Sequence, residues 1–318
     1  MINAYRPEGS LIGTPENIEY TASLQGLERA MSEGRILEGT VLLCDSNLRL
    51  HLDLGGVRGI IEREEAVWCR EGEALKDIAV ITRVGKPICF KVVAIRESCG
   101  RPIAILSRRL AQLECMQRYL SRVSCGDILP ATVTHMENFG AFVDVGCGIS
   151  SLLSVDCISV SRISHPSDRL NIGERIYTVV KSVDKENSRI FVSMRELLGT
   201  WAENAAYFEA GQTVAGIVRS IESYGVFIEL APNLAGLAEI RDNSRDTQIA
   251  QVGQYVAVYI KSIIPDRMKI KLVIIDSYKG EIPPKRIRYF IDTEHVSHLD
   301  YWRYSPEGNK KVIETIFD

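Results

Sequence analysis

The chain has 318 residues, of which 46% are hydrophobic and 25% are charged, and its formal net charge is −3. These values are typical of a folded globular protein and argue against a disordered chain. Because no run of about 18 apolar residues occurs, we expect no membrane-spanning helix.

The first 33 residues carry five acids and two bases and are expected to form an acidic arm. They contain no basic start followed by an apolar block, so we expect no secretory signal. The eight cysteines form no C-x-x-C pair, which favours reduced thiols, a cytoplasmic location and no metal site.

A repeated unit dominates the rest of the sequence. The segment GDILPATVTHMENFGAFVDVG from Gly126 aligns without gaps with GQTVAGIVRSIESYGVFIELA from Gly211. Farther on, NIGERIYTVVKSVDKENSRIFVS from Asn171 aligns with QVGQYVAVYIKSIIPDRMKIKLV from Gln251. A weaker copy begins at Gly34, so we expect three repeats of about 70 to 75 residues each.

Each repeat alternates apolar and polar residues with the period of a half-buried β-strand, which indicates small β-barrels. The residues predicted to face outward are Arg49, His51 and Asp53 in the first repeat, Phe142 and Asp144 in the second, and Phe227 and Glu229 in the third.

Between the barrels the apolar period becomes helical, at 107–122 and 193–208. We therefore expect an arm at 1–33, barrels at 34–110, 125–197 and 211–277, helical connectors at 111–124 and 198–210, and an aromatic and basic extension at 278–318.

The second and third repeats each place two aromatic residues around a glycine. Phe142 and Phe227 lie on the outward face, and Phe139 and Tyr224 precede them by three residues. A bulge or kink at the intervening glycine would bring both rings to one side, where they could stack on successive bases. The alternative is that one ring of each pair closes the end of its barrel.

The last strand of each repeat supplies positive charge. Arg189 and Phe191 are predicted to face outward in the second repeat, and Lys269 and Lys271 in the third. Cations beside rings suit a sugar–phosphate chain with unpaired bases. Asp184 is expected to form a turn or to orient Arg189.

Residues 261–288 carry eight bases and three acids, among them Lys279, Lys285 and Arg286. This run indicates either a surface that faces a polyanion or an ordinary solvated surface.

The pattern G-x-x-x-x-A-x-V…F-G-A-F-V-D-V-G…V-K-S-V-D-x-E-x-x-R-I-x-V-S resembles the RNA-binding repeat of the ribosomal protein S1 family. The resemblance implies a five-stranded OB-fold barrel, and so a mainly β chain of three tandem barrels joined by short helices, with a small C-terminal extension. The family's RNA-binding positions fall on Phe139, Phe142, Asp184 and Arg189 in the second repeat, and on Tyr224, Phe227 and Lys269 in the third.

The family's histidine position holds Ser154 in the second repeat and Glu239 in the third, where Ile264 holds the aspartate position. The first repeat lacks the rings: Asn47, His51 and Ile103 stand at the equivalent positions. By analogy with the family, residues 34–110 are expected to contact the small ribosomal subunit or to act as a scaffold.

After residue 277, Pro283 and Pro284 mark a break. The alternation of Ile287, Tyr289 and Ile291 and the aromatic cluster that follows predict a small β unit or an ordered extension. The cluster of Tyr301, Trp302 and Tyr304 is expected to pack on the third barrel or, alternatively, to extend an RNA path. His295 and His298 lie three residues apart without a third metal ligand nearby.

No catalytic motif and no cofactor motif occurs, so no enzymatic activity is expected. The leading hypothesis is a monomeric protein that binds single-stranded mRNA and acts in translation. The alternatives are an RNA-binding regulator of transcription or RNA decay away from the ribosome, and a protein-interaction scaffold.

Overall fold

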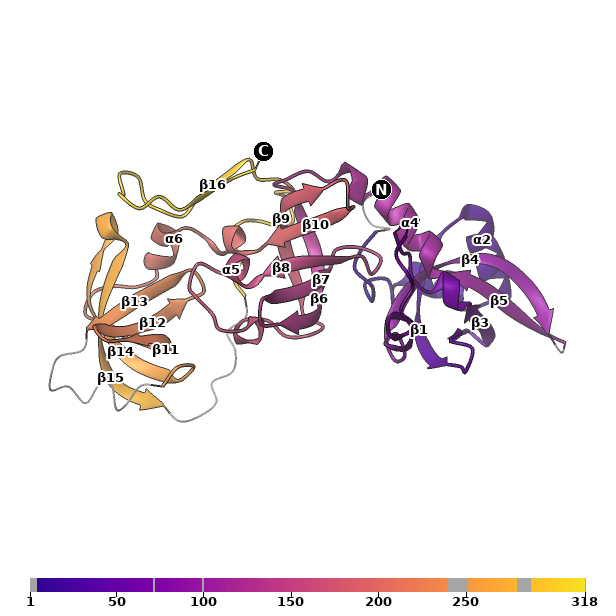
Figure 1. The fold of residues 1–318 in the computed structure, drawn as a ribbon, viewed down its shortest axis with the longest axis horizontal. Coiled ribbons are helices and arrows are strands. Elements are labelled where there is room, and N and C mark those ends of the chain that lie inside the picture. Colours follow the sequence, from indigo (N-terminus) through magenta and orange to yellow (C-terminus); the bar gives the residue numbers. More distant parts are fainter. Residues whose placement is uncertain (1–4, 71, 99, 240–250, 279–286, 318) are drawn as a thin grey trace. The chain divides into compact units, whose positions relative to one another are not determined.

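The computed structural model describes residues 5–70, 72–98, 100–239, 251–278 and 287–317. Lys279, Lys285 and Arg286 of the basic run, and the Pro283–Pro284 break, lie outside these ranges. The described chain forms three closed five-stranded barrels and a two-stranded sheet (Figure 1). The predicted fold class, three tandem OB-type barrels with short helices, is therefore confirmed.

The chain divides into two compact units, which are described separately. The first comprises residues 1–123, 130–132 and 144–150, and the second comprises residues 124–129, 133–143 and 151–318. The first unit holds the first barrel, and the second holds the third barrel and most of the second.

The first barrel has the strand order β1-β2-β3-β5-β4. Its strands are β1 (Ile36–Cys44), β2 (Leu50–Leu54), β3 (Val57–Ile61), β4 (Pro87–Ser98) and β5 (Arg101–Ser107), and its helices are α1 (Pro15–Thr21), α2 (Leu24–Glu33), η2 (Arg63–Glu65), α3 (Asp77–Ile81) and α4 (Arg108–Arg118). Residues expected as an acidic arm thus form α1 and α2. Leu27 and Ala30 of α2 are fully buried in the same core as Phe90 of β4.

The prediction that His51 faces outward from the first barrel is wrong. Its side chain is only 6% exposed. Its Nε2 lies 2.9 Å from Asp45 Oδ2, and Nη2 of Arg58 lies 3.0 Å from its Nδ1. A buried imidazole needs hydrogen-bond partners for both nitrogens, and these two residues supply them.

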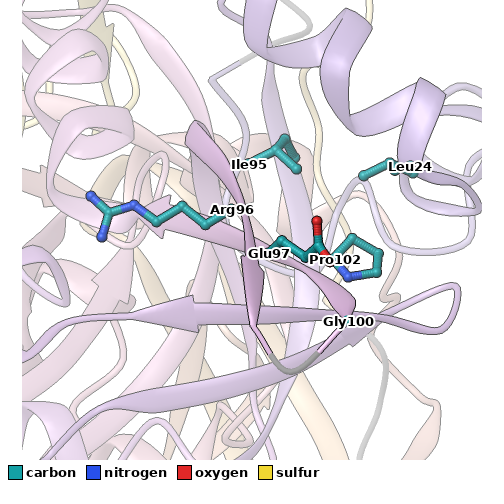
Figure 2. Close-up of a pocket in the computed structure, with 6 residues that line it drawn as sticks. All are labelled: Leu24, Ile95, Arg96, Glu97, Gly100 and Pro102. Carbon is teal, nitrogen blue, oxygen red and sulfur yellow. The ribbon is translucent and has the colours of Figure 1, made fainter.

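An open pocket of about 470 Å³ lies beside the long β4–β5 hairpin (Figure 2). It is lined by Leu24, Ile95, Arg96, Glu97, Gly100 and Pro102. Figure 2 shows the Arg96 side chain reaching away from Leu24 and Pro102. The pocket is wide open and is lined by Arg96 and Glu97 as well as by apolar side chains, unlike an enclosed, mostly apolar small-molecule site.

The second and third barrels share one topology. The second barrel consists of β6 (Ile128–Glu137), β7 (Gly140–Asp144), β8 (Ser150–Ser154), β9 (Arg175–Asp184) and β10 (Arg189–Ser193), and the third of β11 (Thr213–Glu222), β12 (Gly225–Ala231), β13 (Leu234–Glu239), β14 (Tyr255–Ile264) and β15 (Lys269–Tyr278). Each closes through one parallel pair, β8 with β10 and β13 with β15. Because of this closure, a single strand separates the basic last strand from the strand that carries the rings: β8 lies between β10 and β7, and β13 lies between β15 and β12.

The connectors are helical, as their periodicity predicts. Residues 107–122 form α4 and η3 (Leu120–Arg122), and 193–208 form η5 (Arg195–Leu198) and α6 (Trp201–Ala205). Ser107 caps α4 by accepting a hydrogen bond from the Leu110 amide. Short turns α5 (Val155–Ile158), η4 (Pro166–Asp168) and η6 (Pro265–Arg267) complete the helical elements of the described ranges.

Glu229 and Asp144, which were predicted to face solvent, are both buried. Glu229 is 4% exposed, and its carboxylate accepts from Arg169 at 2.6 Å and from Arg219 at 2.7 Å. Asp144 Oδ1 accepts from the amides of Gly146 and Gly148. Both side chains leave the β-sheet on the predicted face, but other parts of the chain cover that face, so each carboxylate is compensated by donors.

The C-terminal extension contains β16 (Tyr301–Arg303) and β17 (Glu314–Ile316), which pair with each other. This pair is the predicted small β unit, whereas residues 287–291 belong to no strand. Tyr289 packs edge-on against Tyr177, and its hydroxyl accepts from the Tyr177 amide. Trp302 and Tyr304 are buried in the core of the third barrel, as the packing interpretation predicts.

None of the helices in the described ranges combines the length and the apolar character that crossing a bilayer requires.

Candidate nucleic-acid interface

The second barrel presents the predicted ring pair on one surface. Phe139 lies in the turn before β7 and is 56% exposed, and Phe142 lies in the middle of β7 and is half-buried. Their ring centroids are 6.0 Å apart and the planes meet at 89°. The rings therefore touch edge to face and leave the face of the outer ring open to solvent.

The third barrel repeats this arrangement. The centroids of Tyr224 and Phe227 are 6.1 Å apart, with an interplanar angle of 89°, and Tyr224 is 58% exposed. Two barrels with different sequences thus hold an aromatic pair in the same geometry.

In the third barrel, the strand has no bulge at the glycine between the rings. The register of β12 against β11 runs without interruption through Gly225, and the shift lies farther along, between Val218 and Ser220. A Cβ at Gly225 would instead lie 2.7 Å from the carbonyl oxygen of Ala238, and one at Gly140 would lie 2.5 Å from that of Leu153. The neighbouring strand approaches too closely for any side chain, and the turn before the strand brings the rings together.

A further ring adjoins the pair in the second barrel. His135 of β6 stacks on Phe142 with centroids 6.2 Å apart and an interplanar angle of 22°. Its Nε2 lies 2.8 Å from Glu137 Oε1, and its side chain is 59% exposed. Alternation along β6 would not have found His135, because it shares the parity of the buried Leu129, Ala131 and Val133 and is nevertheless exposed.

The last strands bring cations to the same surfaces. In the third barrel, Leu237 of β13 lies opposite both Phe227 and Lys271, so the ring and the ammonium group stand in one row across the sheet. In the second barrel the position of Lys271 is taken by Phe191, which lies opposite Leu152 of β8. Lys269 is exposed at the start of β15.

Asp184 forms the turn that the sequence suggests. Its two carboxylate oxygens accept from the backbone and side-chain amides of Asn187, at 2.9 and 2.8 Å, and so shape the β9–β10 turn. It also lies directly opposite the exposed Arg189. The Asn187 hydrogen bonds lower the pKa of Asp184, and the positive charge of Arg189 adds to this effect.

Glu239 introduces a negative charge into the third barrel's surface. It lies opposite Gly225 on β13, and its Oε1 is 3.3 Å from Nζ of Lys271. Both side chains remain largely exposed, at 60% and 45%. The second barrel has the neutral Ser154 at the end of the equivalent strand.

The first barrel lacks the surface of paired rings and cations that the other two barrels present. His51 is buried between Asp45 and Arg58, and Ile103 of β5 lies opposite Arg58 and Arg96. The backbone amide of Asn47 donates a hydrogen bond to Asp45 Oδ1 in the turn before β2. The aligned positions of this barrel therefore offer no ring pair.

No group of three or more histidine, cysteine, aspartate or glutamate side chains gathers as a metal site in the described parts of the chain. His295 instead contacts Asp292, and His298 contacts Asp127, each at 2.7 Å.

Comparison with known proteins agrees with this geometry. Residues 123–195 match the family model of the S1 RNA binding domain. Small ribosomal subunit protein bS1 of Rickettsia conorii is 26% identical over 78% of this chain and 44% of its own length. The bS1 protein of Staphylococcus saprophyticus is 30% identical over 68% of this chain and 56% of its own length.

Among solved structures, GSP13 from Bacillus subtilis aligns with 23% of this chain and 57% of its own, at 23% identity and a TM-score of 0.23. The chain spans about half the length of the bS1 relatives that it matches. Its second barrel thus matches the S1 RNA binding domain, and 68–78% of the chain is similar to part of these bS1 ribosomal proteins.

Proposed function

We propose that the chain binds single-stranded RNA through the outer faces of its second and third barrels, without catalysing a reaction. The observation that carries the proposal is the ring pair, Phe139 with Phe142 and Tyr224 with Phe227, held in the same edge-to-face geometry in both barrels. An exposed ring on a β-barrel stacks on an unpaired base of any sequence, worth about 1–3 kcal/mol per base.

The charged residues complete such a site. Arg189, on the same strand as the aromatic Phe191, supplies the positive charge of the second barrel, and Lys269 and Lys271 supply that of the third. Phosphates of a strand that stacks on the rings would lie within reach of these cations, and Asp184 would hold Arg189 in place.

We further propose a role in translation, in the cytoplasm and as a monomer. The relatives are named small ribosomal subunit proteins, and the first barrel, which lacks the rings, is available as a contact to the small subunit through residues 34–110. Co-sedimentation with small subunits and polysomes tests this part. A protein that remains in the soluble fraction would favour a regulator that works away from the ribosome.

The RNA-binding proposal is tested by fluorescence anisotropy with labelled oligouridylate. Replacement of all four rings by alanine should weaken binding at least a hundredfold, since several stacking contacts are lost together. Tyr301→Ala is the matched control, because Tyr301 is 47% exposed but lies on the C-terminal extension. Equal affinity of the four-ring variant and the wild type would refute the stacking mechanism.

A further inference from the structure

The binding faces of the second and third barrels differ at two aligned positions. In the third barrel, Ser220, Phe227, Leu237 and Lys271 follow one another across β11, β12, β13 and β15. The gapless alignment of the repeats places His135 at the position of Ser220 and Phe191 at that of Lys271. The second barrel thus has aromatic groups at both ends of the row, where the third has a hydroxyl and an ammonium group.

The contact between His135 and Phe142 is a stacking contact. Their planes are inclined by only 22°, whereas Phe139 meets Phe142 at 89°. One face of the imidazole is turned to Phe142, and with 59% of the side chain exposed the ring remains open to solvent. The Glu137 carboxylate, 2.8 Å from Nε2, holds the ring by its edge and leaves its face free.

We propose that His135 is a base-stacking residue, which gives the second barrel a subsite for one more unpaired base than the third barrel has. This inference rests on the proposed RNA binding of the same surface. The stacked imidazole continues the aromatic surface of Phe142 onto β6, so a strand crossing the barrel meets rings on β6 and β7 in succession.

The test replaces His135 by the residue of the third barrel. His135→Ser should weaken binding to oligouridylate about fivefold or more, which corresponds to loss of one stacked base. His135→Phe should retain the affinity, because it keeps a ring, whereas His135→Lys, which offers charge without a ring, should not. The reciprocal Ser220→His should strengthen binding.

A direct measurement separates stacking from mere support of Phe142. In the NMR spectrum of the full chain, the ring protons of His135 should shift upfield when oligouridylate is added, because a stacked base shields them. Absence of such a shift, or equal affinity of His135→Ser and wild type, would overturn the inference while RNA binding by the wild type still stands. If His135→Lys binds oligouridylate as tightly as His135→Phe does, the inference is overturned as well. Failure of the wild type to bind would remove both proposals.

Discussion

The ion pair between Lys271 and Glu239 should limit the affinity of the third barrel for RNA. The two groups lie 3.3 Å apart on the surface that carries Tyr224 and Phe227. A phosphate that approaches Lys271 therefore also approaches a carboxylate. Two unit charges about 5 Å apart in water repel by about 0.8 kcal/mol, which is roughly a fourfold change in affinity.

Glu239→Gln removes this charge and keeps the size of the side chain. We expect it to raise the affinity for oligouridylate about fourfold at low salt. Freed from its partner, Lys271 also becomes available to a phosphate, so the slope of log K against log salt should steepen by up to about 0.7. Because both groups are exposed, the free energy of unfolding should change by less than about 1 kcal/mol.

The assay is fluorescence anisotropy at salt concentrations from about 50 to 200 mM, the range over which phosphate contacts are strongly screened. Glu307→Gln is the matched control, since Glu307 is an exposed carboxylate on the C-terminal extension. If Glu239→Gln binds no better than the wild type at any salt concentration, Lys271 does not face the RNA and the argument fails.

Three other predictions concern the framework. Gly140→Ala should lower the free energy of unfolding by about 1–3 kcal/mol, because the new Cβ would lie 2.5 Å from a backbone carbonyl oxygen. Thermal unfolding measures this loss of stability, and an unchanged midpoint would contradict the close approach. Glu229→Gln should destabilise the second unit by about 3–5 kcal/mol, since it breaks the buried ion pairs of Arg169 and Arg219; chemical denaturation tests this, and a loss under 1 kcal/mol would count against it. Burial raises the pKa of Glu38 from 4.5 to about 7, so the native first barrel keeps a proton that the unfolded chain releases, and its stability should fall as the pH rises through this interval. Hydrogen exchange of β1 at pH 5 and pH 8 should show this fall in the wild type and a smaller fall in Glu38→Gln, because burial also raises the pKa of Asp144 in the same unit to about 7.

The sequence predicts the barrels and the ring pairs because both follow from local pattern. Alternation identifies the strands, and the gapless repeat aligns Phe139 with Tyr224 and Phe142 with Phe227. The two rings of each pair lie in one turn and the strand that follows it, so a few neighbouring residues determine how the rings are placed.

What the sequence could not predict depends on segments that are distant along the chain. Alternation shows that Glu229 leaves the outer face of β12, but not that Arg169, 60 residues earlier, covers it. In the same way, the stacking of His135 on Phe142 depends on how β6 and β7 align, which a single sequence does not fix. The same limit applies to Asp144, which accepts a hydrogen bond from the amide of Glu8, 136 residues earlier.

The burial of Glu229 also affects how the second and third barrels combine their affinities for one RNA. Its strand carries Phe227 two residues earlier, and its partner Arg169 belongs to the second barrel, so one buried ion pair fastens a stacking strand to the neighbouring module. For an RNA long enough to reach both faces, the second encounter is intramolecular and occurs at an effective concentration set by this fixed spacing. Short RNAs gain nothing from it. The chain should accordingly discriminate RNAs by length much more strongly than by base.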